Sequence, residues 1–445
     1  MMRTLIVAGM VVCAGVLTHA AAAAATADPP SRYGVDAPEL APLGPFAVGY
    51  KTLHLVQPGQ IDVLTYDAAT GTAARADRIL DVELWYPALA SPASARQAYA
   101  VTFPAEVPGT RISFSVSGIA MRDAAAAGTR HPLVIVSHSW STEPAAMSWI
   151  TENLASKGYV VAAMHHNDPP INDRSGLPQM VLRRPLDIAY VTETLQKVLA
   201  AERLIDPART ALIGYSIGGY GVLTAAGATL DPGAGAAKFV PGGLLLPYTA
   251  GGALRDSIKV KNLRAVVAIS PAGGGALGAW GADGVRGITA PLLLISGDRD
   301  RTVDYSTGAR AIFDRALAAP RYLLTFHGAG HSLGVNPAPD VMRQRLWDQD
   351  WFEDPVWRKN RINAINAHFI TAFLDRYLKS DESRAAYLDV RVADSAAGVW
   401  PATETQAPPA YDAFSPGSGD VTVWKGFQRG HAVGLEMLHA AAQAQ

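Results

Sequence analysis

The chain has 445 residues, of which 49% are hydrophobic and 17% charged, a composition that excludes a disordered or coiled-coil protein and predicts a large buried core. Lys and Arg number 38 against 39 Asp and Glu, which gives a net charge of -1. Because the sequence contains no block of like charge, we expect no nucleic acid partner and no attraction to an anionic membrane surface. The expected partner is a small, largely uncharged molecule.

The N-terminus has the pattern of a secretory signal peptide over residues 1–27. Arg3 supplies a positive start, Leu5–Leu17 is an apolar run shorter than a bilayer span, and small residues follow at 20–27. A retained membrane anchor is the alternative, which the short run disfavours. We therefore expect an exported protein, periplasmic or secreted after cleavage, without stable membrane association. The only cysteine, Cys13, lies in this segment, so the mature chain would form no disulfide.

Strand and helix patterns alternate along most of the chain. Apolar runs predict strands over Val48–Val56, Ile79–Tyr86, His131–Ser137, Tyr159–Met164, a run around Leu212, Arg264–Ser270, Pro291–Ser296 and Arg321–Phe326. Helical spacing predicts helices over Glu143–Lys157, Arg184–Leu204, Tyr220–Ala228 and Asn360–Leu378. This alternation predicts an α/β fold with a mostly parallel, doubly wound sheet, opened by the first two strands as an antiparallel pair.

Three segments interrupt this alternation. Residues 88–128 are rich in Ala, Ser and Pro and are predicted as variable surface with one strand-like piece at Ile112–Val116. The apolar, Gly-rich stretch 229–263 is predicted as a lid-like insertion or pocket wall. One large domain is expected over residues 28–380, followed by a C-terminal extension, 381–445, packed on it. That extension is predicted to contain a strand at 421–424 and a short apolar helix.

The run around Leu212 stops in Gly214-Tyr-Ser216-Ile-Gly218, the pattern of a nucleophile elbow between a strand and a helix. Such a turn strains the serine backbone, and glycine on both sides leaves the space that the turn needs. Serine is a poor nucleophile at neutral pH, so it requires a base and a third group that orients this base. The hypothesis therefore depends on finding those partners.

Two strand ends downstream supply an acid and a base in the order that an elbow serine requires. Asp298 and Asp300 follow one strand, and His327 and His331 follow the next. We favour Asp300 because of the turn residues around it, and His331 because glycines flank it. Asp298 and His327 remain the alternatives, and either aspartate could instead cap a helix. The predicted catalytic residues are Ser216, Asp300 and His331.

Acyl transfer also needs hydrogen-bond donors for the developing oxyanion. The backbone N–H of Ile217, directly after the nucleophile, is the first expected donor. The second is predicted to be the backbone N–H of Trp140, in the loop that follows the strand His131–Ser137. We also predict that the Trp140 indole binds substrate by lining the acyl or alcohol pocket. Plain core packing is the alternative for this side chain.

His165 and His166 raise the alternative of a zinc site. Adjacent histidines point to different sides of a strand, and no third ligand is spaced for them, so we expect neither a metal site nor any other cofactor. Metal-assisted hydrolysis through this pair stays as a rival hypothesis. Large aromatic residues elsewhere are predicted to pack in helices and loops, with a role for one of them in a pocket wall as the alternative. These are Trp280, Trp347, Trp351, Phe352 and Trp357.

Over about residues 46–380 the sequence resembles the α/β-hydrolase superfamily. More narrowly, it is similar to bacterial exported proteins described as predicted dienelactone hydrolases, near the platelet-activating-factor acetylhydrolase and polyester-hydrolase branch. The resemblance rests on Asp81–Pro87, Pro132–His138, Arg184–Ile188, Gly214–Gly218, Gly297–Asp300 and Gly328–His331, with Trp424–Phe427 in the tail. Two positions depart from the pattern: Ser139 stands where the family usually has Gly, and Ser216 where dienelactone hydrolases have Cys.

The resemblance implies an exported serine carboxylic-ester hydrolase that acts through an acyl-enzyme on small, largely uncharged esters. A lactone, an aromatic diester or a polyester is the alternative substrate class for the same mechanism. A hydrolase-fold binding protein without activity is the alternative from another functional class. The presence of Ser216, Asp300 and His331 in order argues against it.

Overall fold

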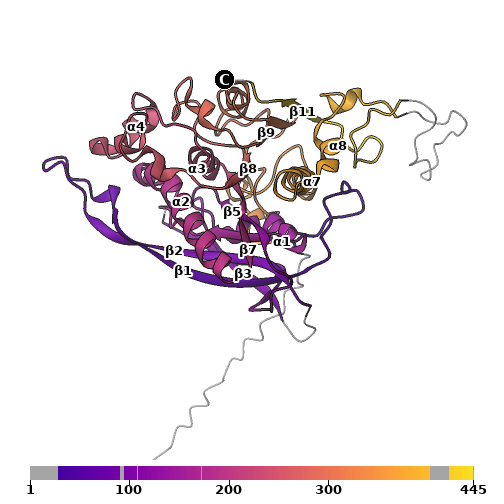
Figure 1. The fold of residues 1–445 in the computed structure, drawn as a ribbon, viewed down its shortest axis with the longest axis horizontal. Helices are drawn as coiled ribbons and strands as arrows, with labels where there is room; N and C mark the ends of the chain where they lie inside the picture. The colour runs from indigo at the N-terminus through magenta and orange to yellow at the C-terminus, as the bar shows by residue number, and fades with distance from the viewer. Residues whose placement is uncertain (1–28, 91–94, 108, 172, 401–419, 444–445) are drawn as a thin grey trace, which may run out of the picture.

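The computed structural model describes residues 29–90, 95–107, 109–171, 173–400 and 420–443 (Figure 1). The predicted signal peptide, residues 1–27, lies outside these ranges. Within them, no helix has both the length and the apolar character needed to cross a membrane.

Eleven strands of the described residues form a single sheet. They are β1 (Ala47–Ile61), β2 (Arg75–Ala88), β3 (Arg96–Pro104), β4 (Arg111–Arg122), β5 (His131–Ser137), β6 (Val160–Met164), β7 (Ile205–Tyr215), β8 (Leu263–Ile269), β9 (Leu292–Gly297), β10 (Arg321–Phe326) and β11 (Leu435–Ala440). Their order across the sheet is β11-β10-β9-β8-β7-β5-β6-β2-β1-β4-β3. The strands from β10 to β6 run parallel, whereas β1, β2 and β6 pair antiparallel. This arrangement confirms the predicted fold class.

The central strands are buried on both faces. In β5, Val134 and Val136 belong to one hydrophobic cluster, and Leu133 and Ile135 belong to the cluster on the other face. A strand buried in this way appears in the sequence as a continuous apolar run, which is why β5, β6, β8, β9 and β10 lie within one residue of their predicted bounds.

Helices cover both faces of the sheet. They are α1 (Ser148–Ser156), α2 (Leu177–Ala201), α3 (Ile217–Ala225), α4 (Gly235–Phe239), α5 (Ala311–Arg315), α6 (Leu346–Gln349), α7 (Lys359–Leu378) and α8 (Ala385–Leu388). Helices α1 and α7 lie on one side of the sheet, and α2 and α3 on the other (Figure 1). The helix predicted from residue 143 is shorter than expected, because Pro144–Met147 forms a 3-10 turn ahead of α1.

Helix α2 begins seven residues before the predicted start at Arg184 and contains Pro185 in its interior. Proline has no backbone N–H, so the carbonyl of Val181, four residues earlier, loses its helical partner. The Tyr220 hydroxyl donates a hydrogen bond to this carbonyl at 2.9 Å. Tyr220 belongs to α3, so the bond also joins the two helices beside the predicted elbow.

The prediction of variable surface over residues 88–128 is wrong, because β3 and β4 form an antiparallel hairpin there. Tyr99, Val101 and Phe103 alternate along β3 and are buried. Polar and small residues lie between them, since the hairpin is at the edge of the sheet and covers the core with one face only. The single predicted piece, Ile112–Val116, lies inside β4.

The two predictions for the C-terminal tail are also wrong. Residues 421–424 form no strand, and the segment predicted as an apolar helix is β11, which pairs antiparallel with β10. Leu435 and Met437 alternate on its buried side. Without β11, the N–H and C=O groups along one side of β10 would have no strand partner, and this pairing outweighs the local helical pattern.

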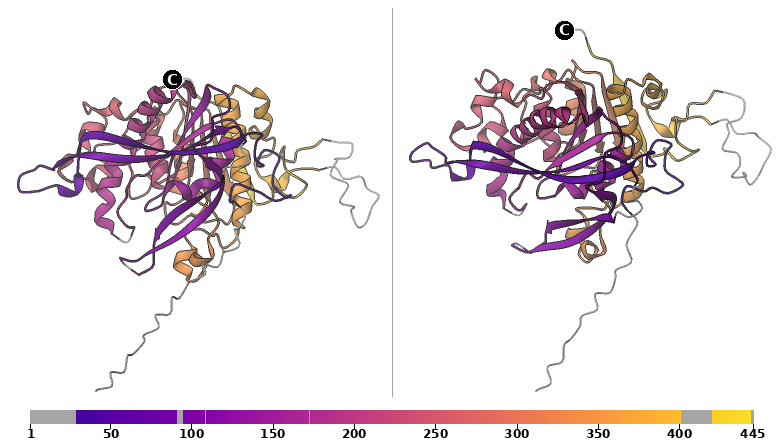
Figure 2. Two further views of the ribbon diagram at one scale, coloured as in Figure 1. Left: turned by 90° about the horizontal axis from the view of Figure 1, so that it is seen from below. Right: turned by 60° about the horizontal axis from the view of Figure 1, so that its bottom comes forward.

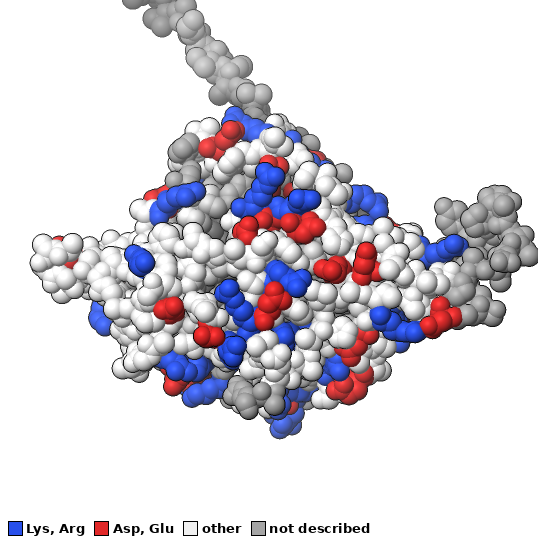
Figure 3. Space-filling view, turned by 90° about the horizontal axis from the view of Figure 1, so that it is seen from above, with Lys and Arg blue, Asp and Glu red and all other residues white. Residues whose placement is uncertain are grey.

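The insertion at 229–263 folds into α4 and three short 3-10 turns, and Val240, Leu245 and Ile258 bury side chains in the cluster on the α2 side. Its function as a lid stays a prediction. Elsewhere, β1 continues past Val56, the predicted end of this strand, through a register shift between Gln57 and Gln60. The β1–β2 ribbon extends beyond the body of the protein (Figure 2). Positive and negative side chains are interspersed on the face shown in Figure 3.

Candidate active site

Ser216 occupies the sharp turn between β7 and α3, with φ 56° and ψ −117°. This left-handed backbone is unusual for a residue with a side chain and is typical of a strained functional turn. A Cβ at Gly214 would overlap the carbonyl oxygen of Gly218, and a Cβ at Gly218 would overlap the carbonyl oxygen of Ser137. The two glycines of the motif are therefore required by the close approach of backbone to backbone.

The structure brings Ser216, His331 and Asp300 together from the ends of three strands. His331 Nε2 lies 2.9 Å from Ser216 Oγ, and His331 Nδ1 lies 2.7 Å from Asp300 Oδ2. The Asp300 side chain is fully buried, while that of His331 is 17% exposed. This is the geometry of a nucleophile, a base and a group that orients the base.

Asp300 is held as a carboxylate in a buried position. Its Oδ1 accepts hydrogen bonds from the backbone N–H of Thr302, at 2.9 Å, and of Val303, at 3.2 Å. Burial acts to raise the pKa of the Asp300 carboxyl, but the hydrogen bond and charge of His331, with these backbone donors, keep that pKa below its usual value. A negative charge therefore faces His331 Nδ1 and fixes its proton there.

The alternative pair, Asp298 and His327, makes contacts of its own. His327 Nδ1 lies 3.0 Å from Asp298 Oδ2, and Asp298 Oδ1 accepts the N–H of Gly328 at 2.7 Å. The His327 side chain is 44% exposed. This pair anchors the base of the loop that carries His331, whereas the contact with Ser216 is made by His331.

The loop around His331 is fixed on several sides. The Gly330 N–H donates to Asp354 at 2.7 Å, and the Tyr215 hydroxyl donates to the His331 carbonyl at 3.2 Å. The buried Lys359 Nζ donates to the Ser332 carbonyl. Burial lowers the pKa of Lys359 to about 7, against the opposing effect of Glu353 and Asp354. These contacts hold the imidazole toward Ser216 before substrate binds.

Within the part of the chain that the structure describes, the N–H groups of the two predicted oxyanion donors have no acceptor. Ile217 is the first residue of α3, so its N–H has no helical acceptor. The carbonyl of Ser216 accepts hydrogen bonds from Tyr220 and Ala272, which fixes the peptide that carries the Ile217 N–H. Among the described residues, neither Ile217 N nor Trp140 N donates to an acceptor within hydrogen-bond distance.

The Trp140 side chain is half-buried and packs against the cluster on the α2 and α3 side of the sheet. Its Nε1 donates to the Pro169 carbonyl at 2.8 Å. Its predicted contact with substrate stays a proposal.

His165 and His166 directly follow β6, and their side chains face different partners. His165 Nε2 lies 2.9 Å from Glu83, whereas His166 lies 3.0 Å from Asp187 and 2.9 Å from the Ser137 hydroxyl. Burial and the charge of Arg184 lower the pKa of His166 to about 3, so it is neutral. In the part of the chain that the structure describes, no three His, Cys, Asp or Glu side chains are arranged to hold a metal ion.

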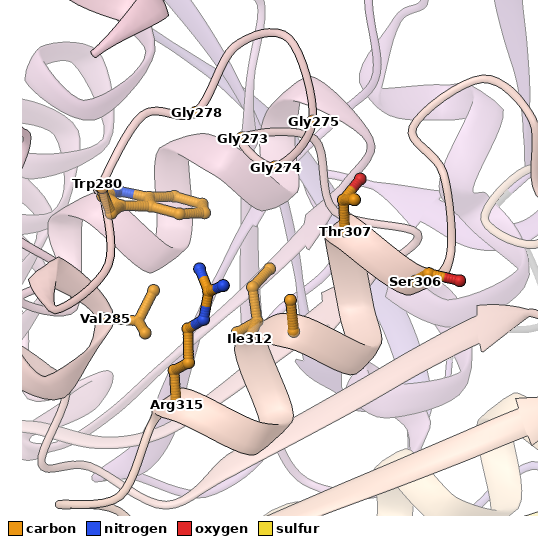
Figure 4. A pocket seen from close by; sticks show the side chains of 12 residues that line it. Gly273, Gly274, Gly275, Gly278, Trp280, Val285, Ser306, Thr307, Ile312 and Arg315 are labelled. Carbon is orange, nitrogen blue, oxygen red and sulfur yellow. The ribbon is translucent and has the colours of Figure 1, made fainter.

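A cavity of about 280 Å³ lies beside α3, between a glycine-rich loop and α5 (Figure 4). The ring of Trp280 and the side chain of Arg315 face it, and Ser216 is not among its lining residues. Trp280 is 4% exposed, stacks on Tyr220 and donates from Nε1 to Thr224 at 3.0 Å. Trp280 therefore packs against the elbow helix, as its sequence context predicts.

Residues 90–237 match the model of a family described as PET hydrolase-like. A solved structure described as a ferulic acid esterase from Streptomyces cinnamoneus, at 2.4 Å resolution, matches with a TM-score of 0.50 and 21% sequence identity. The match covers 75% of this chain and 91% of that chain. The chain has the α/β-hydrolase fold. No curated protein shows significant sequence similarity to this chain.

The comparisons confirm the predicted fold, and the match over residues 90–237 agrees with the polyester-hydrolase branch of the resemblance. The family match contains the elbow and the loop with Trp140, but it ends before Asp300 and His331. At 21% identity, the likeness to the esterase structure concerns the fold. The assignment of Asp300 and His331 in this chain therefore depends on the geometry around Ser216.

Two residues of the site that the motifs did not identify are Arg184 and Asp168. Arg184 appears in the sequence only as part of the family resemblance, although an arginine next to a proline within an apolar helix pattern is an unusual combination. Its side chain is 1% exposed and pairs with Asp168, which is 3% exposed. A long charged side chain this deeply buried requires specific partners, and besides Asp168, which follows β6, these are the His138 and Ser139 carbonyls of the loop after β5.

Proposed function

We propose that the protein is a serine carboxylic-ester hydrolase that works through an acyl-enzyme. The observation that carries the proposal is the continuous contact from Ser216 Oγ through His331 to Asp300, with distances of 2.9 and 2.7 Å. Its support comes from the strained elbow at Ser216, the two free N–H groups, and the match to a PET hydrolase-like family.

In the proposed reaction, Ser216 Oγ attacks the ester carbonyl as its proton moves to His331 Nε2. The N–H groups of Ile217 and Trp140 stabilise the oxyanion of the tetrahedral intermediate. His331 then returns the proton to the leaving alkoxide oxygen, which releases the alcohol and leaves the acyl group on Ser216. A water molecule repeats the sequence, and its attack releases the carboxylic acid and restores the serine. Asp300 holds the histidine tautomer throughout.

Esters of aromatic carboxylic acids are the substrate class favoured by the comparisons, within the broader class of small uncharged esters. The matched family is described as PET hydrolase-like and the matched structure as a ferulic acid esterase, and both descriptions are consistent with such substrates. A panel of p-nitrophenyl esters, dialkyl phthalates, feruloyl esters and polyester particles tests this choice. Preference for short aliphatic esters over all aromatic ones would contradict it.

The substitution Ser216→Ala tests the proposed mechanism. We expect hydrolysis of p-nitrophenyl butyrate to fall by at least about 10³-fold, because the nucleophile is lost while binding and the oxyanion donors remain. Circular dichroism and the thermal midpoint provide the control for folding. Undiminished turnover by folded Ser216→Ala protein would overturn the proposal.

Export is proposed from the pattern of residues 1–27. After expression of the full chain in a Gram-negative host, N-terminal sequencing of protein from the periplasm or medium should show cleavage within residues 20–27. An uncleaved N-terminus in the membrane fraction would instead support the retained anchor.

A further inference from the structure

A buried ion pair contacts the loop that carries one of the two oxyanion donors. The pair joins Arg184 of α2 to Asp168, and the loop is His138–Thr142, which follows β5. We propose that Arg184 and Asp168 are positioning residues that fix the direction of the Trp140 N–H. This inference rests on the proposed function, since it assigns a cause to the geometry of the oxyanion site.

Arg184 and its neighbours hold the carbonyl side of the loop. Arg184 Nη1 donates to the His138 carbonyl at 2.6 Å, and Nη2 donates to the Ser139 carbonyl at 3.3 Å. The Ser139 carbonyl also accepts from Thr142 Oγ1 at 3.1 Å and from His138 Nδ1 at 2.7 Å. In a planar trans peptide, the N–H points away from the carbonyl oxygen. The donors around Ser139 O therefore direct the Trp140 N–H to the opposite side.

The histidine in this arrangement has a fixed tautomer. His138 Nε2 accepts the backbone N–H of His166 at 3.3 Å, so Nδ1 carries the proton that is donated to Ser139. Burial and the charge of Arg184 lower the pKa of His138 well below its usual value, which keeps the ring neutral. The ring is thus one more fixed donor to the same peptide.

Asp168 holds the other side of the turn. It contacts Arg184 Nη2, and its Oδ2 also accepts the N–H of Ser141 at 3.2 Å. The following carbonyl, of Pro169, accepts from Trp140 Nε1 and Ser141 Oγ, both at 2.8 Å. Ser141 has φ 52°, a strained conformation that these contacts maintain. The Ser141 N–H therefore has an acceptor, while the Trp140 N–H has none among the described residues.

The positive charge of Arg184 also strengthens the Trp140 N–H as a hydrogen-bond donor. A cation bonded to a peptide carbonyl polarises the peptide and makes its N–H a stronger donor. A guanidinium presents five donors in a fixed plane, so Arg184 can bind two carbonyls and Asp168 together, which a lysine ammonium cannot do with the same geometry. Gly221 of α3 packs against Arg184, so α2 connects this loop to the helix that carries the Ile217 N–H.

Paired oxoester and thionoester substrates test the inference in the variants Arg184→Lys and Asp168→Asn. Sulfur is a weaker hydrogen-bond acceptor than oxygen, so thionoester turnover depends less on the oxyanion donors. We expect kcat for the oxoester to fall about 10- to 100-fold in Arg184→Lys, with KM nearly constant. We expect the oxoester-to-thionoester ratio of kcat/KM to fall at least about fivefold in both variants, Asp168→Asn showing the smaller change.

Arg78→Gln is the matched control. Arg78 is 14% exposed and binds Asp187 and the His166 carbonyl at 2.6 to 2.7 Å, but it does not contact the loop. We expect its oxoester-to-thionoester ratio to equal that of the wild type, even if its stability falls. Equal losses on both substrates in folded Arg184→Lys and Asp168→Asn would overturn the inference. Oxoester turnover that survives Ser216→Ala would instead overturn the proposed function.

Discussion

At the residue scale, two aspartate–histidine pairs lie close together in sequence, and one of them faces Ser216, the proposed nucleophile. Asp300 is buried and holds His331, which reaches Ser216, whereas Asp298 holds the more exposed His327. The sequence analysis favoured Asp300 and His331 because of the turn residues and glycines that flank them. In the structure, backbone N–H groups donate hydrogen bonds to the Asp300 carboxylate and stabilise its charge. No sequence motif identifies these donors.

Asp300→Asn should lower kcat for ester hydrolysis by about 10⁴-fold, because an amide no longer selects the histidine tautomer that accepts the serine proton. Steady-state kinetics on p-nitrophenyl butyrate measure this change. Asp298→Asn is the matched control, since asparagine keeps an acceptor for the Gly328 N–H. A large loss in Asp298→Asn together with an active Asp300→Asn would reverse the assignment.

At the element scale, α7 carries a buried histidine that connects distant segments. His368 is fully buried, and its Nδ1 accepts the Leu40 N–H at 3.1 Å. Its ring packs on Tyr387 and on Phe427 of the C-terminal segment. Burial, with added repulsion from Lys157, lowers the pKa of His368 to about 3. The folded protein therefore holds this ring neutral at pH values where the unfolded chain would bind a proton.

Acid should destabilise the protein partly through His368. Its folded pKa of about 3 lies below the unfolded value of 6.5, so the unfolded state binds more protons between these values and stability falls as pH falls. Between pH 7 and pH 4.5 this site should account for about 2–3 kcal/mol. Denaturant unfolding measures the free energy of unfolding of the wild type and of His368→Gln at both pH values. The difference between the two proteins should be smaller at pH 4.5 than at pH 7 by that amount. A difference independent of pH would contradict the assignment.

At the scale of the whole molecule, the two ends of the described chain close the same domain. β11 pairs along all of β10, and the Glu39 N–H donates to the Gly426 carbonyl at 2.9 Å. Trp424 is 3% exposed, donates from Nε1 to the Val392 carbonyl at 2.9 Å and packs on Phe369 of α7. The C-terminal segment is therefore part of the sheet and core.

Trp424→Ala should lower the free energy of unfolding by about 3–5 kcal/mol, because it leaves a cavity beside α7 and removes a buried hydrogen bond. Urea denaturation measures the change. Val433→Ala is the control in the same segment, because Val433 is 56% exposed and should change stability by less than about 0.5 kcal/mol. Equal, small effects of both substitutions would show that the segment contributes little to the core.

The parts that the sequence predicted are those with local patterns. The central strands form continuous apolar runs, and the elbow, acid and histidine occur in order at strand ends. The hairpin of β3 and β4 and the strand β11 were missed because their structure depends on the neighbours that they pair with. Arg184 and the His138 carbonyl lie 46 residues apart in sequence, so no motif could reveal that one holds the other.

The central claim is that Ser216 is the nucleophile and that His331 activates it. Labelling with a fluorophosphonate, followed by peptide mass spectrometry, tests it most directly. We predict one phosphonyl adduct, on Ser216, with its formation tracking the loss of esterase activity and slowed at least about 10²-fold in His331→Gln. Active protein that stays unlabelled at Ser216, or is labelled elsewhere as activity is lost, would contradict the claim.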